Sequence, residues 1–430
     1  MATFNEIARR VLLASTGIAS LGASSAMAAP VYQYLTNIPI PASPDNVPLS
    51  GAGNKFQTYD IADVSSAAHL LYLADRSNAA VDIFNTQTLS YVGRIGGSST
   101  TIPGSVAFAG QKSSNALSGP DGVQVAPSVG QVFVGDGNSV LSGYTLSTNA
   151  PTFKTNLGGK FRTDELAFDP TRGYVIAVNN ADAPPFVSIV NGNTGSNAGT
   201  IVKQITFNGA NNTPDATSGG LEAPVYDPVT GKYYVNVVQI GTSGPGAVSE
   251  IDPANGFAVT RTFDLSTSLG ANGSCAPTGL VAGNDGRLLV GCGAGVASVL
   301  IDPRASAGAN GSQKIINGIA GEDEVYYDSS LDLYYTASRN DPKGPLLGII
   351  SGDGTLLQTL GTTPNDHSVA VDAINGDVFV PAGSPGNTAC PSGCILVYAP
   401  VPEPSSLPLL GGMLLGLVGM VGFRVARRHH

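Results

Sequence analysis

Short apolar stretches with alternating polar residues recur along most of the chain, and polar turns rich in Gly, Asn, Asp or Pro separate them. In each copy a small or acidic residue precedes a short apolar strand, a turn often written Asp-Pro or Asn-Gly follows, and a second strand rich in Tyr and Val comes next. This pattern predicts β-hairpins. It appears as "YDIADVSSAAHLLYLAD", "PDGVQVAPSVGQVFVGD", "TDELAFDPTRGYVIAVN", "LEAPVYDPVTGKYYVNV", "PTGLVAGNDGRLLVGCG", "EDEVYYDSSLDLYYTAS" and "NDHSVAVDAINGDVFVP", which makes seven copies.

Most copies continue with a third strand, such as "AVDIFNTQT" or "FVSIVNGNT", and a fourth, such as "YVGRIGG" or "LLQTLGT". Repeats of roughly 40 to 60 residues with four strands each are typical of propeller blades. We therefore predict an all-β, seven-bladed β-propeller over residues 29–400. The last copy lacks a fourth strand, and "VYQYLTNIPI" at residues 31–40 has the pattern of an outer strand. We expect this N-terminal strand to pair beside "ILVYAP" and close the ring.

Composition supports this class of fold and narrows the partners. The chain has 55 Gly, no Trp and 12% charged residues, which favours many short strands over amphipathic helices. The net charge is −10 and no run of Lys or Arg occurs, so nucleic acid is excluded as an expected partner.

The four cysteines are an even number in a chain that we expect to be exported, so disulfides are predicted. Cys275 and Cys292 flank the hairpin turn "GNDG", and Cys390 and Cys394 lie in the short loop "CPSGC". Metal ligation by these cysteines is the alternative, which the scarcity of histidine disfavours.

The N-terminus has the three parts of a secretory signal: a basic segment ending at Arg9 and Arg10, an apolar stretch, and small residues closing with Ala26 and Ala28. We predict a signal helix over residues 1–28 with cleavage near Ala28. The paired arginines are also compatible with twin-arginine export.

At the C-terminus, residues 401–430 contain an apolar run over residues 407–423 between a Pro-Glu-Pro element and a basic end. A membrane span needs about 20 apolar residues, so this run is marginally long enough to form a transmembrane helix. A permanent anchor and a buried core helix are the alternatives. The arrangement resembles the PEP-CTERM sorting signal of Gram-negative bacteria, and the matching residues outside the helix are Pro402, Glu403, Pro404, Arg424, Arg427 and Arg428.

The resemblance implies that exosortase, a membrane protease, cuts near the Pro-Glu-Pro element after a transient stay in the inner membrane. The propeller would then reach the cell surface or the extracellular matrix of a species that forms exopolysaccharide and biofilm. The repeats themselves resemble YVTN/NHL-type propeller repeats, especially "GPDGVQVAPSVGQVFVGD", over most of residues 55–400. That resemblance implies the fold and does not specify a function.

Acidic residues precede several of the predicted innermost strands, which face the tunnel of a propeller. These candidate ion-binding positions are Asp121, Asp164, Glu222, Asp323 and His367, with Glu165, Glu324 and Asp366 beside them. Carboxylates gathered at one tunnel mouth repel one another unless a cation such as Ca²⁺ joins them. The alternative interpretation is structural, since Asp and Asn before a strand cap turn amides.

The sequence therefore predicts an exported propeller that acts as a non-catalytic binding protein, with exopolysaccharide or surface proteins as partners. No catalytic residue and no cofactor are assigned, apart from the Ca²⁺ hypothesis. The alternative function is a metal-dependent, lactonase-like hydrolase with its acidic site at the tunnel mouth.

Overall fold

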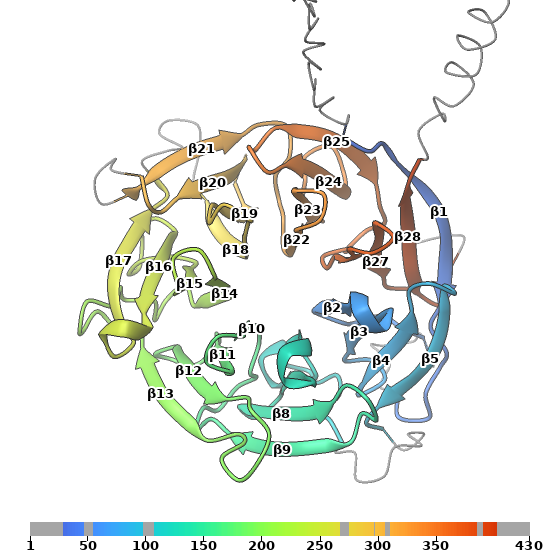
Figure 1. Ribbon diagram of the computed structural model, residues 1–430, viewed down its shortest axis with the longest axis horizontal. Helices are drawn as coiled ribbons and strands as arrows, with labels where there is room; N and C mark the ends of the chain where they lie inside the picture. Colours follow the sequence, from blue (N-terminus) through green and yellow to red (C-terminus); the bar gives the residue numbers. More distant parts are fainter. Residues whose placement is uncertain are drawn as a thin grey trace, which may run out of the picture.

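The protein is a ring of seven four-stranded antiparallel sheets arranged as blades around a central tunnel (Figure 1). The computed structural model describes residues 29–46, 55–97, 107–266, 275–295, 297–305, 310–384 and 390–401. The predicted all-β, seven-bladed propeller is confirmed. Within these ranges, no helix combines the length and apolar character needed to cross a bilayer. The predicted signal helix, with Ala26 and Ala28, and the tail from Pro402 to Arg428 lie outside the described residues.

Six blades consist of four strands that follow one another in the chain, ordered from the tunnel outward (Figure 1). Their strands are β2 (Ala62–Ser65), β3 (Leu70–Asp75), β4 (Ala80–Asn85) and β5 (Ser90–Ile95); β6 (Val123–Ala126), β7 (Gln131–Asp136), β8 (Val140–Thr145) and β9 (Pro151–Asn156); β10 (Leu166–Asp169), β11 (Tyr174–Asn179), β12 (Phe186–Asn191) and β13 (Ile201–Thr206); β14 (Leu221–Asp227), β15 (Lys232–Val237), β16 (Ala247–Asp252) and β17 (Ala258–Asp264); β18 (Ala276–Ala282), β19 (Leu288–Ala294), β20 (Ser298–Asp302) and β21 (Ser312–Ile316); β22 (Val325–Asp328), β23 (Leu333–Ser338), β24 (Leu346–Ser351) and β25 (Leu356–Gly361). Short 3-10 helices lie in the loops at η1 (Ser66–Ala68), η2 (Asn115–Leu117), η3 (Pro127–Val129) and η4 (Pro253–Asn255).

The seventh blade joins the two ends of the chain. Its strands, from the tunnel outward, are β26 (Ala370–Asp372), β27 (Asp377–Ala382), β28 (Cys394–Pro400) and β1 (Tyr32–Pro39). Strand β1 pairs antiparallel with β28, from Tyr32 opposite Pro400 to Pro39 opposite Cys394. The predicted closure by an N-terminal outer strand is therefore confirmed.

The hairpin turn after the innermost strand explains why Asp and Gly recur at the turns of the repeat. In the turn after β10, the Asp169 carboxylate accepts hydrogen bonds from the amides of Thr171 and Arg172, and Gly173 has a positive φ of 70°. The equivalent turn after β14 has Asp227 and Gly231 in the same roles. An Asp that satisfies turn amides and a Gly in the left-handed region fix the tight reversal between the first two strands.

Apolar side chains fill the spaces between neighbouring blades, and each of the seven interfaces holds one buried cluster. The second strand of each blade supplies the most deeply buried side chains, because both of its faces meet another blade. In β11, for example, every residue from Val175 to Asn179 is buried. The hydrophobic core is thus a ring of interfaces, and its stability depends on the ring being closed.

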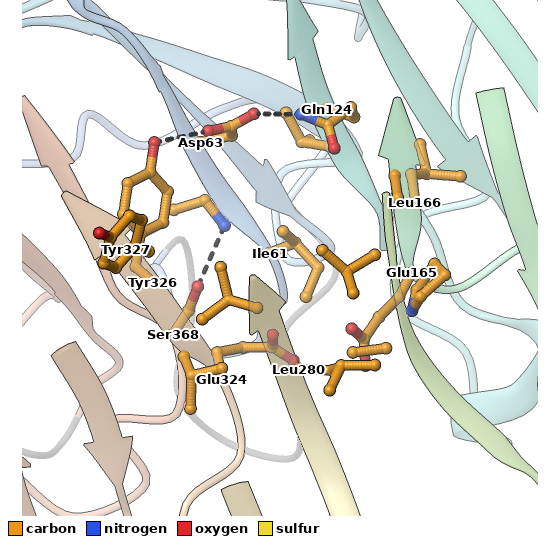
Figure 2. Close-up of a pocket in the computed structure, with 18 of the residues that line it drawn as sticks. Ile61, Asp63, Gln124, Glu165, Leu166, Leu280, Glu324, Tyr326, Tyr327 and Ser368 are labelled. Carbon is orange, nitrogen blue, oxygen red and sulfur yellow. Dashed lines mark hydrogen bonds between the residues drawn. The ribbon is translucent and has the colours of Figure 1, made fainter. Parts of the chain in front are cut away.

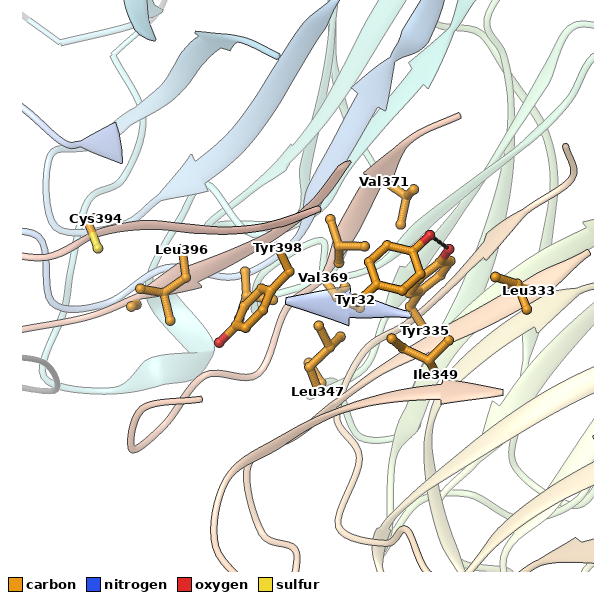
Figure 3. Close-up of a cluster of buried hydrophobic side chains, with 14 of the residues drawn as sticks. Tyr32, Leu333, Tyr335, Leu347, Ile349, Val369, Val371, Cys394, Leu396 and Tyr398 are labelled. Atoms are coloured by element: carbon orange, nitrogen blue, oxygen red, sulfur yellow. Dashed lines mark hydrogen bonds between the residues drawn. The ribbon is translucent and has the colours of Figure 1, made fainter. Parts of the chain in front are cut away.

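Strand β1 contributes to the interface between the closing blade and the blade that precedes it (Figure 3). Tyr32 of β1 is 1% exposed, and its hydroxyl lies 2.7 Å from the hydroxyl of Tyr335 in the preceding blade. The backbone amide of Tyr32 donates to the side chain of Gln358 at 2.9 Å, and Gln358 donates back to the Tyr32 carbonyl at 2.8 Å. These contacts link β1 to strands β23 and β25, so β1 fastens the closing blade to its neighbour.

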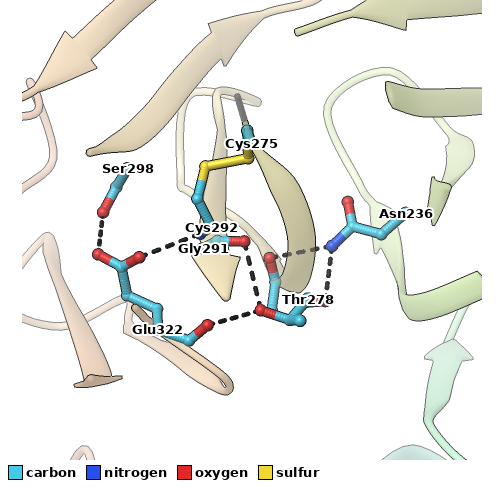
Figure 4. Close-up of a disulfide and its surroundings, with 8 residues drawn as sticks. Asn236, Cys275, Thr278, Gly291, Cys292, Ser298 and Glu322 are labelled. Carbon is cyan, nitrogen blue, oxygen red and sulfur yellow. Dashed lines mark hydrogen bonds between the residues drawn. A yellow bond between two sulfur atoms is a disulfide. The ribbon is translucent and has the colours of Figure 1, made fainter. Parts of the chain in front are cut away.

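Both predicted cysteine pairs are bonded. The Cys275–Cys292 bond, with an S–S distance of 2.02 Å, ties the approach to β18 to strand β19, and Cys390 is bonded to Cys394. Beside the first disulfide, the amide of Cys292 donates at 3.0 Å to the buried carboxyl group of Glu322, which also accepts from Ser298 (Figure 4). Burial raises the pKa of Glu322 to about 7. The disulfide therefore lies beside a buried hydrogen bond that joins two neighbouring blades.

We predict that Tyr32→Ala lowers the free energy of unfolding by about 3 kcal/mol or more, because it leaves a cavity at the closing interface and an unpaired Tyr335 hydroxyl. The matched control is Tyr34→Ala, since Tyr34 lies on the same strand but is 49% exposed. We expect that control to cost less than about 1 kcal/mol. Equilibrium denaturation of both variants measures the difference, and equal losses would contradict the role of β1 as the closing strand.

Candidate functional site at the tunnel mouth

A polar cavity of about 250 Å³ lies at one mouth of the tunnel, next to the starts of the innermost strands. Aspartates stand two residues before the innermost strand in four blades, and glutamates one residue before it in two, so the repeat itself gathers carboxyl groups here. The cavity is lined by Thr58, Tyr59, Asp60, Arg76, Asn115, Arg162, Asp164, Glu165, Glu222, Asp323, Glu324, Arg339, Asn365 and His367.

The structure brings most of the predicted ion-binding residues together. Asp164, Glu222, Asp323 and His367 all line this cavity, whereas Asp121 is fully buried and contacts the Arg76 side chain in the cavity wall. Glu165 and Glu324 also line it. Asp366 has the structural role that the alternative interpretation gave to such residues, because its carboxyl group accepts from the backbone amide of Thr363 at 2.6 Å.

Three arginines that the sequence analysis did not identify supply counter-charges to the aspartates. Arg76 contacts both Asp60 and Asp121. Arg162 donates to Asp164 at 2.7 Å. Arg339 lies 3.0 Å from Asp323. Partly buried charges are stabilised by such pairing, so these aspartates already have counter-ions within the chain.

The repeat contains a sequence position at which two of these arginines recur. Arg76 and Arg339 both stand one residue after the second strand of their blades, in "ADRSN" and "TASRND". Asn180 holds the same position in its own blade, and its side chain contacts Asp164. In these three blades the residue after the second strand therefore faces the mouth. Aligning the copies at that position identifies Arg76 and Arg339, but not Arg162, which precedes the innermost strand of its blade.

One group of carboxylates is close enough to be considered as a cation site. Oxygen atoms of Asp60, Asp121 and Asp164 lie within 4.8 Å of one another, and Oδ2 of the buried Asp121 has no hydrogen-bond partner among the described residues. Burial raises the pKa of Asp121 to about 7, although Arg76 and Arg162 act in the opposite direction. Asp60 was not among the predicted residues, even though it is the second residue of the first copy of the repeat.

Three glutamates differ from the aspartates because no Lys or Arg in the described ranges forms an ion pair with them. Glu165, Glu222 and Glu324 lie near one another, and the side chains of Glu165 and Glu222 are hydrogen-bonded. Burial, reinforced by the neighbouring carboxyl groups, raises the pKa of Glu222 to about 8 and the pKa values of Glu165 and Glu324 well above their usual range. A carboxyl group in such a setting keeps its proton near neutral pH.

His367 is held as a structural residue. Its ring stacks on Tyr59 with centroids 4.3 Å apart, and its two nitrogens face the carbonyl oxygens of Asn365 and Tyr59 at 2.7 and 3.2 Å. Burial lowers the pKa of His367. A neutral imidazole donates from one nitrogen only, but a carbonyl oxygen lies against each ring nitrogen, so His367 is poorly placed to act as a metal ligand or a general base.

A second cavity of about 270 Å³, which we call the inner cavity, is lined by the innermost strands (Figure 2). All seven blades contribute to its wall, which carries aliphatic side chains such as Ile61, Val123 and Leu280 together with polar ones such as Asp63 and Ser368. Glu165 and Glu324 line both cavities, so the mouth and the inner cavity meet at these two side chains.

Fold and site define the chain as a seven-bladed β-propeller with a charged but internally paired mouth. No protein-family model matches the sequence, and no curated protein matches it either. Among solved structures, hydrazine synthase from Kuenenia stuttgartiensis is similar, with a TM-score of 0.57 and 13% sequence identity. The similarity covers 78% of this chain and 96% of that chain. At this identity the likeness shows the fold alone.

We predict that stability falls as pH rises from about 5 to about 8, because folded Glu222 keeps a proton that the unfolded chain releases near the ordinary glutamate pKa of 4.5. Each such group contributes a slope of up to about 1.4 kcal/mol per pH unit. Glu222→Gln removes its own contribution and flattens the profile, which urea denaturation at a series of pH values measures. Asp285→Asn, at an exposed turn, is the control. An unchanged slope in Glu222→Gln would contradict the raised pKa.

Proposed function

We propose that this protein is an exported propeller of the cell surface or extracellular matrix that acts as a non-catalytic binding protein for a hydroxyl-rich ligand, such as a sugar unit of an exopolysaccharide. The observation that carries the proposal is the polar mouth, where arginine and aspartate side chains neutralise one another within the cavity wall. Such a wall offers fixed donors and acceptors without a strong net charge.

The chemistry of the mouth suits a neutral polar ligand better than a small ion. A free anion would have to compete with Asp60 and Asp121 for Arg76, and a free cation would have to displace the same arginine. Sugar hydroxyls both donate and accept, so they bridge such groups without breaking the ion pairs. Amide groups of Asn115 and Asn365 add further neutral partners in the wall.

The proposed export to the cell surface is based on the sequence at the two ends of the chain. The tail resembles a PEP-CTERM signal through Pro402, Glu403, Pro404 and the three terminal arginines. The last described residue, Val401, donates its amide to the Val31 carbonyl at 2.7 Å, beyond the last paired residues of β1 and β28. A cut after Val401 would therefore leave the closing strands paired. We propose exosortase as the protease, and the inner membrane as a transient location.

We predict that the protein isolated from its host has lost the residues after the Pro-Glu-Pro element, with its new C-terminus near Pro402 to Pro404. Intact-mass measurement of membrane and extracellular fractions, with and without the host exosortase, tests this. Replacing Glu403 by Ala should keep the full-length species in the membrane. A full-length tail in both strains would overturn the sorting proposal and favour a permanent anchor.

We also predict that the purified protein binds oligosaccharides at the mouth and that Arg339→Gln weakens this binding by about tenfold, since Asp323 then lacks its partner. A defined glycan array followed by calorimetry measures the effect. The matched control is Arg304→Gln, because Arg304 forms the same kind of pair with Asp302 at a more exposed place. Equal losses in both variants, or no binding to any glycan, would count against the mouth as a glycan site.

The second candidate function is a metal-dependent, lactonase-like hydrolase, and the unpartnered Oδ2 of Asp121 in the described part of the chain is the observation that favours it. Asp60, Asp121 and Asp164 would hold the ion, but Ca²⁺ takes about six to eight oxygen ligands and Arg76 already occupies two of these three carboxylates. These residues therefore fit a tightly bound ion poorly. Stoichiometric metal in the same preparations, lost in Asp121→Asn, would favour the hydrolase over the binding protein.

A further inference from the structure

The inner cavity leads away from the polar mouth along the innermost strands. Glu165 and Glu324, which line both cavities, stand directly before strands β10 and β22. Phe168 and Tyr327, which line only the inner cavity, stand one residue before the ends of the same strands. Because a strand rises about 3.3 Å per residue, the wall extends for about 10 Å from the glutamates to these two rings. With a volume of about 270 Å³, the inner cavity is slightly smaller than most small-molecule pockets, which suits a single ring with its substituents.

Aromatic side chains from three blades line the part of the inner cavity that is farther from the mouth. Phe168, Tyr226 and Tyr327 each stand directly before the aspartate that ends the innermost strand, and each is only partly buried. The hydroxyl groups of Tyr226 and Tyr327 form hydrogen bonds with the side chains of Thr171 and Asp332, so both rings are held in place. Partly exposed rings that are fixed in this way can contact the C–H face of a sugar ring.

The polar groups of the inner cavity favour a neutral ligand. No Lys or Arg from the described part of the chain lines this cavity, so an anionic group would find no counter-charge there. Asp63 is already engaged, because it accepts from the amide of Val125 and the hydroxyl of Tyr326 at 2.7 and 2.9 Å (Figure 2). Burial and the neighbouring carboxyl groups raise the pKa values of Glu165 and Glu324 well above their usual range. Protonated carboxyl groups both donate and accept hydrogen bonds, as the hydroxyl groups of a sugar do.

We propose that the inner cavity is a second sugar subsite, which holds one neutral sugar unit of the glycan that binds at the mouth. The C–H face of this sugar would lie against the aromatic rings, and its hydroxyl groups would face Glu165 and Glu324. The inference rests on the function proposed above and specifies its ligand as a disaccharide unit, with one ring in each of two cavities of similar volume. The mouth supplies ion-paired donors and acceptors, whereas the inner cavity supplies ring contacts and uncharged partners.

Calorimetric titration of the purified protein with glucose, cellobiose and cellotriose, and with the matching β-linked mannose and galactose series, tests the proposal. We expect a disaccharide of at least one series to bind at least about tenfold more tightly than its monosaccharide, because it fills both cavities. The trisaccharide should add little, since the two cavities are then already filled. Tyr327→Ala should remove the gain from monosaccharide to disaccharide, and Tyr327→Phe, which keeps the ring, should retain it.

A second variant, Val281→Phe, narrows the inner cavity without changing a residue of the mouth, and it should also remove the disaccharide gain. The matched control is Tyr174→Ala, because Tyr174 is partly buried as Tyr327 is but lines neither cavity. This control should retain the gain. If Tyr327→Ala does not fold, Val281→Phe decides the question.

A disaccharide gain that persists in both Tyr327→Ala and Val281→Phe would overturn the inner subsite and leave the mouth as the glycan site. Equal affinity for monosaccharide and disaccharide in every series would overturn it in the same way, as would the absence of binding by all of these sugars. The glycan array and Arg339→Gln test the function proposed for the mouth separately, so the two failures can be told apart.

Discussion

The pairing of β1 with β28 is the constraint on which the rest of this structure depends. Each blade buries its apolar faces against two neighbours, so seven sheets form seven interfaces only when the ring is closed. Both interfaces of the closing blade contain residues from β1, including Tyr32 on one side and Ile38 on the other. Without β1, β28 would present an open sheet edge, and two of the buried clusters would lose part of their contents.

Closure of the ring also explains why charged side chains gather at the tunnel mouth. A closed ring brings the same position of every repeat close to the tunnel axis. Acidic residues that recur at one repeat position therefore form a cluster there, although a single copy holds only one of them. Asp60, Asp121 and Asp323 are paired with arginines that follow the second strand of a blade, and Asp164 is paired with Arg162. The three glutamates have no such ion pair among the described residues, and burial together with the neighbouring carboxyl groups raises their pKa values. The crowding of carboxyl groups is thus relieved by ion pairing for the aspartates and favours the protonated form of the glutamates.

The features that the sequence predicted well are those determined by local pattern. The recurring hairpin pattern, with turn residues such as Asp169 and Gly173 in several copies, identifies the seven blades, and the missing fourth strand of the last copy identifies β1 as its replacement. The even number of cysteines and their short spacings predicted disulfides, and the structure supplies the connectivity. The contacts of Arg76 with Asp60 and Asp121 could not be predicted in this way, because they depend on how closely neighbouring blades approach at the axis. The division of the tunnel into two cavities is likewise a result of packing, which no single repeat encodes.

The separation between the two strands of the closing pair has a consequence for how the protein is made. The partners of Tyr32 lie 303 and 326 residues further along the chain, and β28 is the last strand among the described residues. Such long-range contacts form slowly, and β1 can pair with β28 only after all the strands between them have been synthesised. The first strand to emerge is therefore among the last to be incorporated, and the ring is vulnerable to aggregation until that final step.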